Sequence, residues 1–121
     1  MEEEREILEF KVDANNLSNW MEINKTLLMG EIVSASEELV YKSLEELDAF
    51  KIVVKEEIGR TVLNTKVRKE DLIESLDAMM DWAVETEEYE LAHRIKLLKE
   101  YTETIKDDIR PKATRRTRKT K

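Results

Sequence analysis

The spacing of apolar residues is most regular between residues 69 and 109, where it follows the period of a helix. Apolar side chains recur three, four or seven residues apart in two series, Leu72, Leu76, Met79 and Ala83, and then Leu91, Ile95, Leu98, Ile105 and Ile109. This spacing places each series on one face of a helix. The residues between the series are polar, and Thr86 is suited to cap the second helix. The pattern predicts an antiparallel αα-hairpin that turns at residues 86–88.

The first third of the chain contains a short alternating stretch and then a helical pattern. Leu8, Phe10 and Val12 alternate with charged residues, which suggests a short strand. Apolar positions from about residue 14 to residue 33 then fit an amphipathic helix. Gly30 lies inside that helix, at a cost of about 1 kcal/mol relative to alanine, or marks its end.

The middle of the chain has a helical start and an ambiguous continuation. Ser36 is suited to be an N-cap, with acidic residues following it, so we expect a helix over 36–49. Residues 50–67 fit two structures. One continues the helix as far as Gly59, and the other is a β-hairpin that turns at Gly59, which the β-branched residues around it favour.

Together these patterns predict a mainly α fold, in which a small helical domain ends in the αα-hairpin and a short β-hairpin around 50–67 remains one alternative. The expected division is an N-terminal helical or α+β region over 1–68, the hairpin over 69–109, and a disordered basic tail over 110–121. Proline at position 111 and the absence of apolar residues after it favour the last assignment.

Composition supports a helical protein and removes several classes of site. The chain of 121 residues has only two glycines and one proline, which is unlike an all-β sandwich with its many tight turns. It has no cysteine, so disulfides and thiolate metal sites are excluded. No apolar run reaches the length of a membrane span, and the acidic start is unlike a signal peptide, so we expect a cytoplasmic location.

The net charge of −7 is the sum of a body of −14 and a tail of +7. A cationic tail can neutralise phosphates without reading a base sequence, which makes it a candidate nucleic-acid contact. Its basic residues are Arg110, Lys112, Arg115, Arg116, Arg118, Lys119 and Lys121.

Candidate catalytic and metal-binding patterns are sparse. Glu90 and His93 form an E-x-x-H pair, the spacing used in di-iron bundles, but the chain has one histidine and such sites need more ligands. Pairs of neighbouring glutamates are expected to be solvated helix surfaces, because adjacent residues do not face a common point. No nucleophile or phosphate-loop motif occurs. We expect no enzyme activity, no cofactor and no metal.

The segment Ala83–Ala92 resembles the UVR motif, a short helical hairpin of the bacterial excision-repair proteins UvrB and UvrC and of regulators and chaperones of the Clp protease system. The likeness covers about residues 72–105. It implies that the hairpin pairs with another such hairpin, in the same or a partner protein, and carries no catalysis. The matching positions are Ala83, Glu87, Glu88, Tyr89, Glu90, Ala92 and Ile95, whereas His93, Lys96 and Leu97 depart from the family pattern.

The functional hypothesis is a non-enzymatic adaptor that contacts a protein partner, or a second copy, through the hairpin. Four residues lie off the main apolar stripe and supply a second surface, which packs on the N-terminal half or meets another chain. They are Trp82, Tyr89, Leu97 and Tyr101. The residues expected to form the contact are Trp82, Tyr89, Leu91, Ala92, Ile95, Leu98 and Tyr101. The alternative is an accessory factor of repair, replication or transcription that uses the basic tail as a phosphate anchor.

Overall fold

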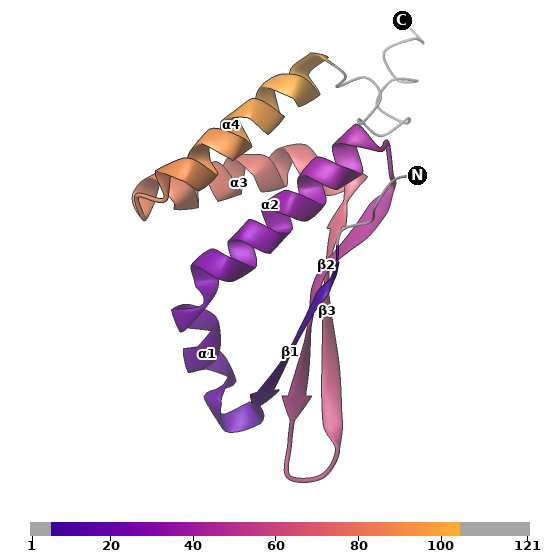
Figure 1. The fold of residues 1–121 in the computed structure, drawn as a ribbon, viewed down its shortest axis with the longest axis vertical. Helices are drawn as coiled ribbons and strands as arrows, with labels where there is room; N and C mark the ends of the chain where they lie inside the picture. Colours follow the sequence, from indigo (N-terminus) through magenta and orange to yellow (C-terminus); the bar gives the residue numbers. More distant parts are fainter. Residues whose placement is uncertain (1–5, 105–121) are drawn as a thin grey trace, which may run out of the picture.

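The computed structural model describes residues 6–104, which form a three-stranded sheet, a helix layer on one of its faces, and a helical hairpin across one end (Figure 1). The strands are β1 (Leu8–Asp13), β2 (Glu46–Lys55) and β3 (Arg60–Arg68). The helices are α1 (Leu17–Ile23), α2 (Lys25–Tyr41), α3 (Leu72–Glu85) and α4 (Tyr89–Thr104), and short 3-10 turns, η1 (Ala14–Asn16) and η2 (Lys69–Asp71), precede α1 and α3.

The sheet has the order β1-β2-β3, with β1 parallel to β2 and β2 antiparallel to β3. A parallel neighbour requires a crossover connection, which α1 and α2 provide. The register aligns Phe10 with Ile52 and Val12 with Val54, so these side chains point to one face of the sheet. On that face Phe10 packs on Phe50, with ring centroids 6.3 Å apart, and on Trp20 of α1, at 5.2 Å.

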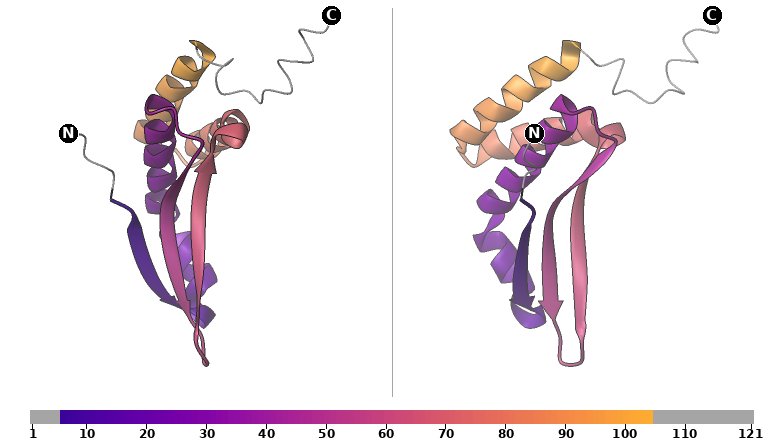
Figure 2. Two further views of the ribbon diagram at one scale, coloured as in Figure 1. Left: turned by 90° about the vertical axis from the view of Figure 1, so that its right-hand side faces the viewer. Right: turned by 45° about the vertical axis from the view of Figure 1, so that its right-hand side comes forward.

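The two faces of the sheet differ in cover. Figure 2 (left) looks onto the open face, and α2 lies behind β1 and β2. The open face carries mainly charged residues, and the helical face carries the apolar ones, as alternation along each strand requires. The sheet is therefore half of a two-layer structure, whose second layer is α2.

One hydrophobic core joins the sheet, α2 and the helical hairpin. The largest fully buried apolar side chains come from all of these elements, and α3 and α4 contribute four of the seven. They are Val33 and Leu39 of α2, Ile52 of β2, Leu72 and Leu76 of α3, and Ile95 and Leu98 of α4. Burial of this apolar surface is the main force that holds α3 and α4 against the rest of the chain.

Both α2 and α3 end in a Schellman motif without glycine. After α3, Glu87 has a positive φ of 62°, and the N–H of Glu88 donates to the carbonyl of Ala83 at 2.8 Å. After α2, Ser43 has a φ of 56°, and the N–H of Leu44 donates to the carbonyl of Leu39 at 2.9 Å. Each motif turns the chain sharply, towards α4 in the first case and towards β2 in the second.

The expected mainly α fold is wrong, because the chain has an α/β fold with a three-stranded mixed sheet. The short strand near Leu8 and the β-hairpin at 50–67 both exist, and the hairpin begins earlier, at Glu46. The predicted helix over 36–49 is wrong beyond Tyr41. Ser36 does not cap it: this side chain is buried inside α2, and its hydroxyl donates to the carbonyl of Ile32 at 2.8 Å.

The predicted αα-hairpin is present as α3 and α4, and its turn lies where the polar residues predicted it. Thr86 has a different role from the expected one. It ends α3, and its hydroxyl donates to the carbonyl of Trp82 at 2.8 Å. Ile105, Ile109 and the basic tail at 110–121 lie outside the described residues.

Candidate protein-interaction site

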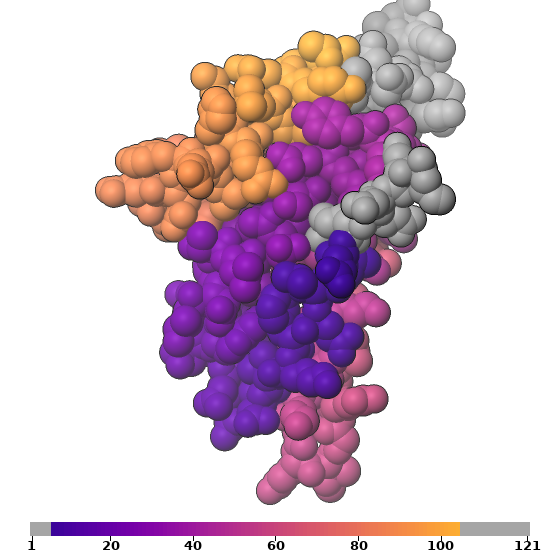
Figure 3. Space-filling view, in the orientation of Figure 1, coloured from indigo at the N-terminus to yellow at the C-terminus, as the bar shows by residue number. Residues whose placement is uncertain are grey.

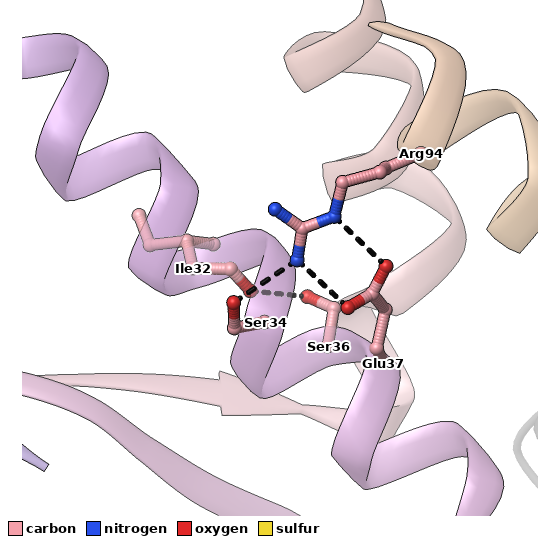
Figure 4. A network of polar contacts seen from close by, with 5 residues as sticks. All are labelled: Ile32, Ser34, Ser36, Glu37 and Arg94. Carbon is pink, nitrogen blue, oxygen red and sulfur yellow. Dashed lines mark hydrogen bonds and ion pairs between the residues drawn. The ribbon is translucent and has the colours of Figure 1, made fainter. Parts of the chain in front are cut away.

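Arg94 fixes α4 onto α2 (Figure 4). Its Nε donates to Glu37 Oε2 at 3.2 Å, and its Nη2 donates to Glu37 Oε1 at 2.8 Å and to the Ser34 hydroxyl at 3.0 Å. The hydrogen bonds with Glu37 raise the pKa of the Arg94 guanidinium, and they outweigh partial burial, which lowers it. This two-point geometry suits the planar guanidinium and fixes the orientation of α4 as well as its distance from α2.

Two further contacts hold the hairpin. At its turn, the Thr26 hydroxyl of α2 donates to Glu88 Oε2 at 3.0 Å. Within the hairpin, Lys99 Nζ of α4 lies 2.8 Å from Asp77 Oδ1 of α3. With the buried apolar residues, these contacts place α4 across the end of the molecule, over α2, as the space-filling view shows (Figure 3).

Side chains on the outer side of α4, together with one at the end of α2, form an exposed apolar surface. We call this surface the α4 ridge and define it as Tyr89, Leu97 and Tyr101 of α4 with Tyr41 of α2. Tyr89 is 64% exposed, Leu97 48% and Tyr101 39%. Tyr89, His93, Leu97 and Tyr101 are spaced four residues apart along α4, so they lie on one broad side of the helix. Tyr41 from the end of α2 is 57% exposed, and its ring centroid lies 4.9 Å from that of Tyr101.

The residues predicted for the partner contact divide between the core and the surface. Leu91, Ile95 and Leu98 are buried in the core of their own chain, and Trp82 and Ala92 are half-buried against it. Only Tyr89 and Tyr101 are exposed. Thus the main stripe of α4 packs on the N-terminal half, and the side chains off that stripe reach the surface.

The sequence patterns missed Tyr41. This residue lies in a stretch predicted as the middle of a helix, where nothing marks it as a surface residue. Its exposure follows from the end of α2 at that position, and its contact with Tyr101 follows from the packing of α4 on α2. Neither relationship has a local signal in the sequence.

The E-x-x-H pair does not join a metal-ligand cluster. Glu90 and His93 are both exposed on α4, and over residues 6–104 no group of three histidine, aspartate or glutamate side chains could hold a metal ion. None of the helices in this range combines the length and the hydropathy of a membrane-spanning segment. The seven basic residues of the tail, from Arg110 to Lys121, lie outside the described range, so their expected contact with nucleic acid stays a prediction.

A groove of about 340 Å³ opens on another side of α2, between α2, β3 and α3. Its lining is mostly apolar or small, and charge is confined to the residues of β3 and η2. The residues are Met29, Ile32 and Ser36 of α2, Thr65, Lys66, Val67 and Arg68 of β3, Asp71 of η2, and Ser75, Ala78 and Met79 of α3. Helical periodicity separates this side of α2 from the side that carries Ser34 and Glu37. Within residues 6–104 the groove and the α4 ridge are therefore separate surfaces.

Comparison with known proteins gives no match: no family model, no curated protein and no solved structure matches this chain. The likeness of the hairpin to the UVR motif therefore stays a prediction from the residues at 83–95.

Proposed function

We propose that this chain is a non-enzymatic protein-interaction module that binds a protein partner through the α4 ridge. The observation that carries the proposal is the exposure of three tyrosines and a leucine along one side of α4 and at the adjacent end of α2. Tyrosine is enriched among the residues that dominate binding energy at protein interfaces, because its ring buries a large area and loses little conformational entropy.

The seating of α4 supports the same proposal. Arg94, Glu37, Thr26 and Glu88 hold the hairpin on α2 before any partner arrives. A surface that is already ordered loses less conformational entropy on binding, which favours affinity. The likeness to the UVR motif favours a helical partner surface, in another protein or in a second copy of this chain. We also propose a cytoplasmic location, with which a chain free of cysteine is compatible.

The experiment compares the unmodified chain with two matched double variants. Tyr89→Lys with Leu97→Lys changes the α4 ridge, and Met21→Lys with Ile23→Lys changes two exposed apolar residues of α1 by the same charge. All four positions are exposed, so each variant is expected to fold, which circular dichroism verifies.

Light scattering after size exclusion measures self-association, and affinity capture with mass spectrometry identifies other partners. We expect the ridge variant to lose the dimer or the captured partner, and the α1 variant to keep it. The proposal would be contradicted if the unmodified chain and both variants were monomers and all captured the same proteins. Loss in the α1 variant alone would place the contact on α1 instead.

A further inference from the structure

β3 is the outer strand of the sheet, and within residues 6–104 no other strand pairs with its far edge (Figure 2). Its nine residues, Arg60–Arg68, pair only with β2. The backbone N–H and C=O groups that point away from a sheet at such an edge form a template for an added strand. β1, the other outer strand, has only six residues.

The helix layer stops short of β3. Leu63 is 39% exposed, whereas its register partner Ile52 on β2 is 2% exposed, although both point to the helical side of the sheet. The groove between α2, β3 and α3 lies further along β3, at Thr65–Arg68. Ser75 and Ala78 of α3 keep it open because their side chains are small, and Met29 and Ile32 of α2 make one wall apolar. The groove adjoins only the Thr65–Arg68 end of β3, so along that part an added strand would point every second side chain towards it.

The charged residues of β3 favour acidic residues in a strand added beside it. Arg60, Lys66 and Arg68 share the open face of the sheet, and β3 contains no acidic residue. Lys66 and Arg68 already contact acidic residues of β2, at distances of 3.3 to 3.8 Å. An added strand would lie about 5 Å from β3 but about 10 Å from β2. Its nearest charged neighbours would therefore be the three cations, which favour acidic residues directly opposite them.

A second copy of the chain is a poorer occupant. When two β3 strands pair antiparallel with full overlap, Asn64 lies opposite Asn64 and Arg60 lies opposite Arg68, twice. Like charges directly opposite each other destabilise a strand pair. Cations on an outer strand also discourage the pairing of identical edges.

We propose that β3 and the adjoining groove bind an extended peptide segment of a partner protein, in which acidic residues alternate with apolar ones. The segment adds a fourth strand beside β3. Its acidic side chains lie on the open face opposite Arg60, Lys66 and Arg68. Its apolar side chains lie on the helical side, where those beside Thr65 and Val67 enter the groove. This surface is independent of the α4 ridge, so either can exist without the other.

The test uses a labelled nine-residue peptide in which glutamates alternate with leucine and valine, and its counterpart with lysine in place of glutamate. Fluorescence anisotropy measures the affinity of the full chain for each. We expect the glutamate peptide to bind at least about tenfold more tightly, because several cross-strand charge pairs change sign together. Hydrogen exchange is expected to slow at the backbone amides of Arg60–Arg68 when the glutamate peptide binds.

Ala78→Arg fills the groove from an exposed position of α3, and Ser18→Arg adds the same charge to an exposed position of α1. We expect the first variant to bind the peptide at least about tenfold more weakly and the second to bind it normally. Equal binding of both peptides, no binding of either, or normal binding by Ala78→Arg would overturn the proposal. If the unmodified chain is a dimer and Ala78→Arg dissociates it, the peptide proposal is overturned and a second copy is the occupant of this surface. The test of the α4 ridge measures self-association and partner capture. Ala78→Arg should leave both intact, which keeps the two tests separate.

Discussion

Arg94 on α4 and Glu37 on α2, residues 57 positions apart in the chain, form a two-point ion pair between the two helices. Arg94→Ala should lower the free energy of unfolding by about 1–2 kcal/mol, a modest figure because the Arg94 side chain is 40% exposed to screening solvent. Urea denaturation measures the change. Arg94→Lys should recover only part of it, because an ammonium cannot reproduce the two parallel hydrogen bonds.

The Lys99–Asp77 pair is the matched control, because it also crosses between helices at 2.8 Å but involves a more exposed carboxylate. Lys99→Ala should cost no more than about 0.5 kcal/mol. The raised pKa of Arg94 sets the pH dependence: its stabilising effect is present below the ordinary pKa of arginine and is lost only as the pH rises through the raised pKa. An Arg94–Glu37 coupling that disappeared in mildly alkaline solution would contradict this assignment.

Replacing either residue of positive φ with glycine should stabilise the protein. Glu87→Gly and Ser43→Gly should each raise the free energy of unfolding by about 0.5–1 kcal/mol, because glycine has no Cβ to strain in that conformation. Thermal and urea denaturation report the effect. Lys42→Gly is the control, since Lys42 has a φ of −101° and gains no such relief. A gain for Lys42→Gly equal to that for Ser43→Gly would argue against relief of backbone strain as the cause.

The two glycines should respond to alanine in opposite directions. A Cβ built at Gly30 meets nothing within 4 Å, and the residue lies inside α2, so Gly30→Ala should stabilise by about 1 kcal/mol. Gly59 has a φ of 82° in the turn between β2 and β3, so Gly59→Ala should destabilise by about 1 kcal/mol or more. Melting curves of both variants, recorded together, separate a change in helix propensity from backbone strain.

Neighbouring apolar residues of α4 should differ sharply in their contribution to stability. Leu98→Ala should cost about 2–5 kcal/mol, because Leu98 is 1% exposed in the shared core. Leu97→Ala should change stability by about 0.5 kcal/mol or less, because Leu97 is 48% exposed. Urea denaturation of both variants measures the contrast. Similar losses would mean that the α4 ridge is buried as deeply as the core stripe.

The predictable elements are those whose signal is local. The apolar series from Leu72 to Leu98 has the helical period, and α3 and α4 follow it closely. The sheet depends on partners distant in the chain: β2 is flanked by β1 and β3, and the β-branched residues at 52–54 cannot show by themselves which strands will pair with them.

The predicted helix over 36–49 is wrong at its start and beyond Tyr41, and each error has an identifiable cause. Serine favours helix starts, but Ser36 satisfies its hydroxyl by bonding to Ile32 inside α2, so the helix continues through it. Ser43 ends the turn after α2 with a positive φ, a conformation in which glycine is the usual residue. In the candidate site, Tyr89 and Tyr101 could be named from the helical period, but separating them from buried Leu91 and Ile95 required the position of α2.

The parallel pairing of β1 with β2 also has a consequence for the order of folding. The β2–β3 and α3–α4 hairpins close short loops, whereas β1 joins β2 only after the chain has passed through α1 and α2. Non-local pairing of this kind is slow to form, so we expect β1 to be docked late. Val12→Ala should therefore accelerate unfolding and leave the refolding rate nearly unchanged in stopped-flow chevron plots. A mainly slower refolding rate would place β1 in the nucleus instead.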